Sequence, residues 1–175
     1  MTRTRLLSAA AVICLSAVVA ASQPVTSLTL PDALLAHVKA ERFGIVTSLR
    51  GLPLGVREAL QTLFGSQTLD IAEPFDSRPL AQGKPGAEFQ VTNAADTRTL
   101  PTRRMIVAGC SEDHHCIVYY ERGGGTHSWH VALFRWQPAS TRFEWGGVAP
   151  RGLTSIEDVR HVMLSGAIKG PSQVW

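Results

Sequence analysis

The second half of the chain contains four β-rich runs separated by short turn segments. The runs are RRMIVAGC, CIVYYER, THSWHVALFRWQ and TRFEWGGV, and SEDHH, GGG and PAS lie between them. Connections this short are typical of antiparallel hairpins. The third run is apolar on both faces, which suits a central strand covered on both sides. The fourth run alternates, so Phe143 and Trp145 are expected on one face and Glu144 on the other. We therefore expect an antiparallel β-meander of about four strands over residues 103–148.

Three other segments predict helices. The first is LTLPDALLAHVKAER, with Gly44 as its stop, and the second runs roughly from Leu54 to Phe64. A third helix is predicted after Thr154 and Glu157, which fit a T-x-x-E capping box, and Gly166 closes it. Two N-terminal helices and one C-terminal helix packed on the meander define an α+β fold.

Two parts of the chain give weaker patterns. The segment IVTSLR, between the first two helices, either extends the first helix or forms a short strand. Residues 66–102 are punctuated by prolines but keep apolar anchors, so we interpret them as an extended connection that wraps the domain. Short strands are expected there around 69–71 and 88–92.

The N-terminal sequence MTRTRLLSAAAVICLSAVVAASQP has the layout of a secretory signal peptide. Arg3 and Arg5 precede an uncharged apolar run over residues 6–20, and small residues follow. The run is shorter than the roughly 20 residues that span a bilayer comfortably. We therefore expect a signal peptide over residues 1–22 and a single globular α+β domain over residues 23–175, in the periplasm or secreted.

Charge and hydropathy exclude two classes of partner. The whole chain has a formal charge of +3, and two of these charges belong to Arg3 and Arg5, which leaves +1 after removal of the leader. A near-neutral domain without a basic stripe has no electrostatic reason to bind nucleic acid. No second long apolar run follows the leader, so no membrane span is expected after its removal.

The segment CSEDHHC predicts a disulfide. Cys14 leaves with the leader, so Cys110 and Cys116 are the remaining pair, and an even pair in an oxidising compartment favours one bond. Cys110 ends one predicted strand and Cys116 begins the next, which brings the two sulfurs together across a hairpin. The sequence therefore predicts a structural disulfide.

Four histidines near this segment give an alternative, a Zn²⁺ or Cu²⁺ site. These candidate ligands are His114, His115, His127 and His130. His114 and His115 are adjacent, so their side chains diverge on an extended backbone, and His127 and His130 are three apart, so they point to opposite faces of a regular strand. A single site that uses all four is not expected, whereas a subset remains open.

A hydrolase is the other alternative. Glu121, His127 and His130 flank the glycine turn, and a carboxylate–imidazole pair there would serve as a base. No G-x-S-x-G, H-E-x-x-H or phosphate-loop motif accompanies them. The three glycines lie between two strands and suit the backbone of a turn.

These observations favour a non-enzymatic function. The leading hypothesis is an exported, disulfide-stapled small binding or accessory protein of the bacterial envelope, with another envelope protein as its partner and no cofactor. The alternative is an exported hydrolase or a Zn/Cu-binding protein that uses the Glu121/His127/His130 region.

Overall fold

The computed structural model describes residues 28–74, 88–91, 100–170 and 175. The signal peptide expected over residues 1–22 lies outside these ranges. Within them, no helix is both long and apolar enough to cross a membrane.

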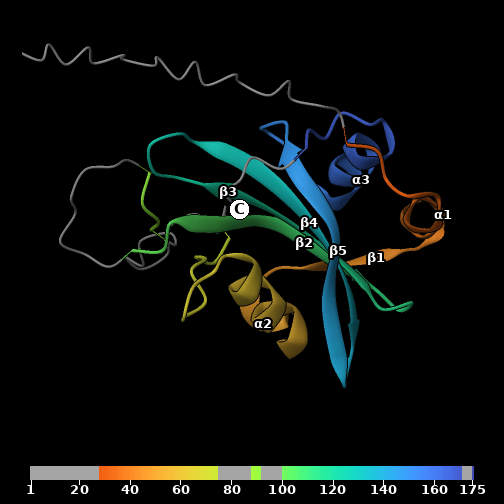
Figure 1. Ribbon diagram of the computed structural model, residues 1–175, viewed down its shortest axis with the longest axis horizontal. Coiled ribbons are helices and arrows are strands. Elements are labelled where there is room, and N and C mark those ends of the chain that lie inside the picture. Colours follow the sequence, from red (N-terminus) through yellow and green to blue (C-terminus); the bar gives the residue numbers. More distant parts are fainter. Residues whose placement is uncertain (1–27, 75–87, 92–99, 171–174) are drawn as a thin grey trace, which may run out of the picture.

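A five-stranded antiparallel sheet forms the centre of the fold (Figure 1). Its strands lie side by side in sequence order: β1 (Phe43–Val46), β2 (Arg103–Ser111), β3 (His115–Arg122), β4 (Ser128–Gln137) and β5 (Ser140–Ala149). The predicted α+β class is confirmed, and the strands β2 to β5 are the expected meander. The sheet has five strands where about four were expected, because the chain after the first helix adds β1 at the edge beside β2.

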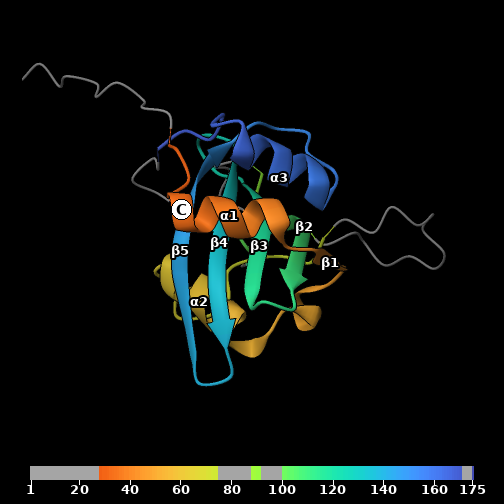
Figure 2. The same ribbon diagram turned by 90° about the vertical axis from the view of Figure 1, so that its right-hand side faces the viewer.

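Three helices cover the sheet, α1 (Asp32–Ala40), α2 (Leu54–Leu63) and α3 (Ile156–Leu164), and the short 3₁₀ helix η1 (Leu49–Gly51) precedes α2. Figures 1 and 2 show α1 and α3 on one face of the sheet and α2 on the other. We call these the α1/α3 face and the α2 face. The sheet is therefore the middle of three layers.

Helix α1 ends earlier than its sequence pattern suggests. Glu41 is its C-cap and already has an extended backbone, with φ −75° and ψ 151°. Gly44, expected to stop the helix, lies within β1 and pairs with Cys110. The sheet edge offers backbone hydrogen bonds to this segment, which resolves the ambiguous IVTSLR region into a strand followed by η1.

Helix α3 begins one residue later than predicted. Its capping box joins Ser155 and Asp158, because the Ser155 side chain accepts from the Asp158 backbone and the Asp158 side chain accepts in return. The box expected at Thr154 and Glu157 is therefore wrong by one position. Gly166 follows the helix with a φ of 72°, as predicted for a helix-closing glycine.

Both faces of the central strand β3 are buried. Ile117 and Tyr119 belong to the core under α1 and α3, whereas Cys116, Val118 and Tyr120 belong to the core under α2. All five are 0% exposed. The two cores explain why the neighbouring run WHVALFRW is apolar on both faces.

A β-bulge in β5 changes the expected alternation of that strand. Leu133 pairs with Trp145 and the next residue, Phe134, pairs with Phe143, so Glu144 is an extra residue with no partner of its own. Trp145 packs into the α1/α3 core and Phe143 against the α2 core. The expectation that Phe143 and Trp145 share a face is therefore wrong, because the bulge reverses the alternation between them.

The connection between α2 and β2 forms no strand in its described residues. Near the expected strand at 69–71, one isolated parallel bridge joins Ala72 to Arg104. Farther along, the Gln90 amide donates to the Pro101 carbonyl at 2.8 Å. Residues 75–87 and 92–99 lie outside the described ranges.

Candidate metal site

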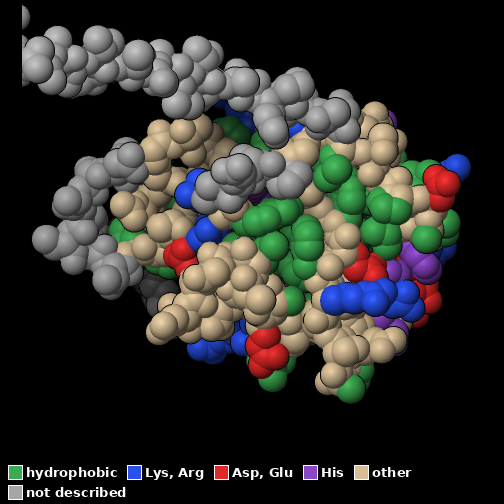
Figure 3. Space-filling view, in the orientation of Figure 1, with side chains coloured by type: hydrophobic (Ala, Val, Ile, Leu, Met, Phe, Trp, Pro, Cys, Tyr) green, Lys and Arg blue, Asp and Glu red, His purple; other side chains and the backbone are tan. Residues whose placement is uncertain are grey.

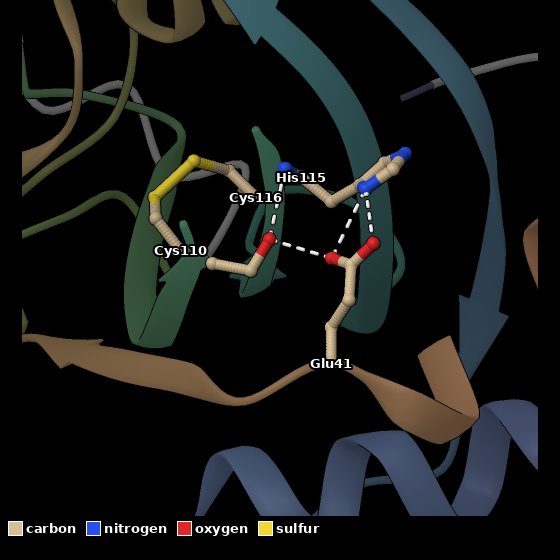
Figure 4. Close-up of a disulfide and its surroundings, with 5 residues drawn as sticks. Glu41, Cys110, His115 and Cys116 are labelled. Carbon is tan, nitrogen blue, oxygen red and sulfur yellow. Dashed lines mark hydrogen bonds and ion pairs between the residues drawn. A yellow bond between two sulfur atoms is a disulfide. The ribbon is translucent and has the colours of Figure 1, made fainter. Parts of the chain in front are cut away.

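The disulfide between Cys110 and Cys116 is present and lies at the β2–β3 turn (Figure 4). The two residues are directly opposite each other in the strand register, with their Cα atoms 4.1 Å apart. The bridge joins the last part of β2 to the first part of β3. It therefore fixes the hairpin end that carries Ser111 and His115.

Replacing Cys110 and Cys116 together by alanine is expected to lower the free energy of unfolding by about 2 kcal/mol, because the bridge closes a short loop in the unfolded chain. Urea denaturation of the wild type and the double variant measures the difference. A reducing agent should destabilise the wild type by a similar amount and leave the variant unchanged. Equal stability of the oxidised wild type and the variant would contradict a stabilising role for the bridge.

Ser111 and His115, each next to a bridged cysteine in the sequence, are both buried on the α1/α3 face, whereas the disulfide itself lies on the α2 face. The His115 amide donates to the Ser111 hydroxyl oxygen at 3.1 Å, and the Ser111 hydroxyl donates to Glu41 Oε2 at 2.5 Å. The hairpin end is thereby connected to the end of α1.

Helix α3 holds the end of α1 over this hairpin. The Arg160 guanidinium donates to the carbonyl of Val38 at 2.8 and 3.0 Å and to that of Lys39 at 3.2 Å. Carbonyl groups in the last turn of a helix lack intrahelical partners and carry a partial negative charge, which favours a cation there. Arg160 therefore helps to position Glu41, the C-cap of α1.

The Glu41 carboxylate contacts two imidazole rings. Its Oε1 lies 2.6 Å from Nδ1 of His37, one helical turn earlier, and 2.8 Å from Nδ1 of His115. Its Oε2 lies 3.0 Å from the same His115 nitrogen. The two imidazole rings are 4.4 Å apart, centroid to centroid. Two histidines and one carboxylate thus converge from a helix and a strand.

His37, Glu41 and His115 form a possible ligand set for a metal ion, and within the described residues it is the one group of three or more that does so. One ligand atom from each lies within 4.8 Å of the others. A tetrahedral Zn²⁺ ion with bonds of about 2.0–2.2 Å separates its ligand atoms by about 3.4 Å. Bringing the two shorter contacts to that value needs shifts of less than about 1 Å, and the ligand atoms that lie up to 4.8 Å apart must approach by up to about 1.4 Å. The His37 side chain is 43% exposed, so it has room to move and leaves a route from solvent.

A pair of buried polar atoms lies on the far side of His115. Nε2 of His115 and Oε2 of Glu144 are both buried without a hydrogen-bond partner, 3.6 Å from each other. A carboxylate only accepts hydrogen bonds, so the contact with Glu41 assigns the ring proton of a neutral His115 to Nδ1. Its Nε2 then presents a lone pair to the Glu144 carboxylate.

A metal ion on Nδ1 would satisfy both atoms. It would place the ring proton on Nε2, which faces Glu144 Oε2. Metal-binding histidines almost always donate their other ring N–H to a carboxylate, a carbonyl or water. Glu144 reaches this position as the extra residue of the β5 bulge, a feature that often redirects side chains near functional sites. The arrangement is suited to holding a divalent transition-metal ion.

The other sequence candidates for metal ligands lie elsewhere. His114 contacts Trp136 edge to face, with ring centroids 5.0 Å apart, so it diverges from His115. His127 and His130 lie at the opposite end of β3, beside the glycine turn. The structure thus brings His115 together with His37 and Glu41, and it does not bring the four candidate histidines together.

Glu121 and His127 form the carboxylate–imidazole pair considered for a hydrolase. His127 Nε2 lies 2.8 Å from Glu121 Oε2, and Arg104 Nε donates to Glu121 Oε1 at 2.6 Å. The guanidinium therefore neutralises the carboxylate, and the His127 ring stacks on Trp129 at 4.4 Å. This pair is an ion-paired cluster at the end of the hairpin, and no described contact gives it a nucleophile.

His130 pairs with a hydroxyl but is a poor base. Its Nε2 lies 2.8 Å from the Ser128 oxygen. Burial, together with the charges of Arg122 and Arg103, lowers the pKa of His130 to about 4. A base in nucleophilic catalysis must hold the proton it takes, and here the imidazolium is disfavoured. His130 is therefore better explained as a buried core residue. Its ring stacks on Tyr120, and its Nε2 is satisfied by Ser128.

Sequence reasoning missed His37, Glu41 and Glu144. One signal was available, since His37 and Glu41 are four residues apart at the end of a predicted helix and so share a face. The sequence did not indicate which strand this face would meet. The bulge that brings Glu144 to His115 gives no signal in a run that alternates cleanly.

Comparisons with known proteins return no match among family models, curated proteins or solved structures. The function of the chain is therefore inferred from the geometry of the site.

Proposed function

We propose that this chain is an exported, disulfide-stapled protein that binds a divalent transition-metal ion, Zn²⁺ or Cu²⁺, through His37, Glu41 and His115. The observation that carries the proposal is the convergence of these three ligand atoms within 4.8 Å. The other ring nitrogen of His115 adds support, because Nε2 and Glu144 Oε2 are buried without a hydrogen bond and lie 3.6 Å apart.

The chemistry of the ligands favours particular metals. Imidazole nitrogen suits Zn²⁺ and Cu²⁺, and one carboxylate oxygen completes a common zinc ligand set. Both cysteines near the site are joined in the disulfide, so no thiolate is available to select Cu⁺. Ca²⁺ and Mg²⁺ require more oxygen ligands than this group offers.

Two features support export. The leader pattern over residues 1–22 is that of a secretory signal peptide, and disulfides form and persist in oxidising compartments outside the cytosol. A disulfide at the hairpin end that carries His115 suits a protein that binds metal in such a compartment, in the bacterial periplasm or outside the cell.

Binding is the proposed role, without catalysis. Three protein ligands leave one coordination position for water, which is the arrangement of a catalytic zinc. Hydrolysis also needs a base beside that water. Among the described residues, Glu41 is itself a ligand and Glu144 lies on the other side of the His115 ring. The site is therefore suited to holding the ion.

Isothermal titration with Zn²⁺ and with Cu²⁺ tests the proposal, using protein expressed from the full sequence and freed of metal with a chelator. One ion per chain is expected to bind with micromolar affinity or tighter. His114→Asn is the matched control, because it removes the neighbouring histidine and asparagine tolerates the backbone φ of 67° at that position. This variant should bind like the wild type. Absence of binding heat, or loss of binding in His114→Asn, would contradict the proposal.

A further inference from the structure

A polar pocket lies on the α1/α3 face, lined in part by Arg135, the strand partner of His115. It has a volume of about 240 Å³ and is lined by Arg135, Gln137, Ser140 and Arg142. Arg135 pairs with Arg142 and Gln137 with Ser140 across the β4–β5 hairpin. Since His115 pairs directly with Arg135, all of these side chains lie on the face of the sheet that carries His115. Figure 2 shows this end of the hairpin extending beyond the part of the sheet that α1 crosses.

The pocket carries excess positive charge. Arg135 and Arg142 are directly opposite each other, an arrangement of like charges that costs stability. Glu144 Oε1 accepts from Arg142 Nε at 3.0 Å and from Nη2 at 2.8 Å. No described residue forms a hydrogen bond or ion pair with Arg135. Of the two guanidiniums that line the pocket, the one of Arg142 is thus paired with a carboxylate. Figure 3 shows acidic, basic and histidine side chains gathered at the right-hand edge of the molecule, where α1 meets the sheet.

We propose that this pocket binds the phosphate group of a small molecule. Guanidinium groups present their donors in a planar fork that matches phosphate oxygens. The Gln137 amide and the Ser140 hydroxyl add neutral donors on the same face. The two guanidiniums and the Glu144 carboxylate leave a net charge of +1, which the negative charge of a phosphate group offsets. The volume is below the roughly 300 Å³ at which pockets for drug-sized ligands begin, so the remainder of the molecule is small.

The phosphate pocket does not share ligands with the metal site. Glu144 lies between them, with Oε1 on Arg142 and Oε2 toward His115. The metal ligands lie on the other side of the His115 ring. Phosphate binding therefore requires no metal ion, and the two sites are tested separately.

The test is titration of chelator-treated protein with inorganic phosphate and with glycerol 3-phosphate at low salt. Both are expected to bind at submillimolar to millimolar concentration. Arg135→Ala and Arg142→Ala should each weaken binding at least about tenfold, because each removes a charged donor pair. Arg151→Ala removes an exposed arginine outside the pocket and should bind like the wild type. Thermal melting checks that each variant is folded.

Two further arms separate the alternatives. Citrate tests for a carboxylate site, and tighter binding of citrate than of glycerol 3-phosphate would overturn the assignment. Equal phosphate affinity of the wild type and Arg135→Ala would also overturn it. The variant His37→Ala, which removes a proposed metal ligand, is expected to bind phosphate normally. Retained phosphate binding in this variant supports the pocket whether or not the metal proposal holds, whereas its loss would contradict an independent site.

Discussion

Replacement of His37 by alanine is expected to weaken Zn²⁺ binding more than about a hundredfold without unfolding the protein. Loss of a residue that only orients a ligand commonly costs 10- to 100-fold in metal affinity, so loss of a ligand itself costs more. The His37 side chain is 43% exposed and contributes little to the core. Titration in the presence of a competing chelator measures the affinity, and thermal melting monitors the fold.

His161 provides the matched control for this substitution. It lies in the last turn of α3 and is exposed, so His161→Ala removes one histidine from a helix end without touching the cluster. This variant should bind Zn²⁺ like the wild type. Two results would contradict the proposed site: a Zn²⁺ affinity of His37→Ala equal to that of the wild type, or an equal loss of affinity in His37→Ala and His161→Ala. Either would show that Zn²⁺ does not bind specifically at His37.

Acidification from pH 7 to about pH 4 is expected to cost about 3 kcal/mol of stability through His130 alone. The folded protein lowers the pKa of His130 to about 4, because burial and the charges of Arg122 and Arg103 disfavour the imidazolium. In the unfolded chain the pKa is near 6.5. Between these two values the unfolded state binds more protons, so stability falls as the pH is lowered from about 6.5 to about 4.

Urea denaturation at pH 7 and at pH 4.5 isolates this contribution. His130→Phe keeps an aromatic ring against Tyr120 and cannot take up a proton. Carboxylates titrate equally in both proteins, so the variant should lose about 2–3 kcal/mol less than the wild type over this range. A wild type and variant with the same pH dependence would show that His130 is not held neutral by its surroundings.

The sheet could be predicted because its strands pair with their neighbours in the sequence, so each hairpin is encoded by a short, continuous segment. Runs such as RRMIVAGC and CIVYYER combine β-branched and aromatic residues with short turns, and each hairpin pairs neighbours in sequence. Strand β1 was only one of two possibilities, since four residues form a strand only where an edge accepts them. The bulge at Glu144 depends on packing between the two cores, which the alternation of TRFEW conceals.

The site was predicted in part. The expected oxidising compartment and the position of the two cysteines at either end of one hairpin turn indicated the Cys110–Cys116 bond. His115 was among the candidate metal ligands. His115, His127 and His130 were considered together as metal ligands because they are close in the sequence. In the structure, the length of β3 separates His115 at the β2–β3 turn from the two histidines at the glycine turn. His115 instead meets α1, more than seventy residues earlier in the chain. Contacts of this separation depend on the docking of a helix on a sheet and leave no local pattern.

The most direct test of the metal site is anomalous X-ray diffraction at the zinc absorption edge, from crystals of the protein loaded with one equivalent of Zn²⁺. The geometry predicts a single strong peak about 2.0–2.2 Å from Nδ1 of His37, a carboxylate oxygen of Glu41 and Nδ1 of His115. His115 Nε2 should then lie within hydrogen-bond distance of Glu144. A peak at Glu121 and His127, or no peak on the protein, would contradict the proposed site.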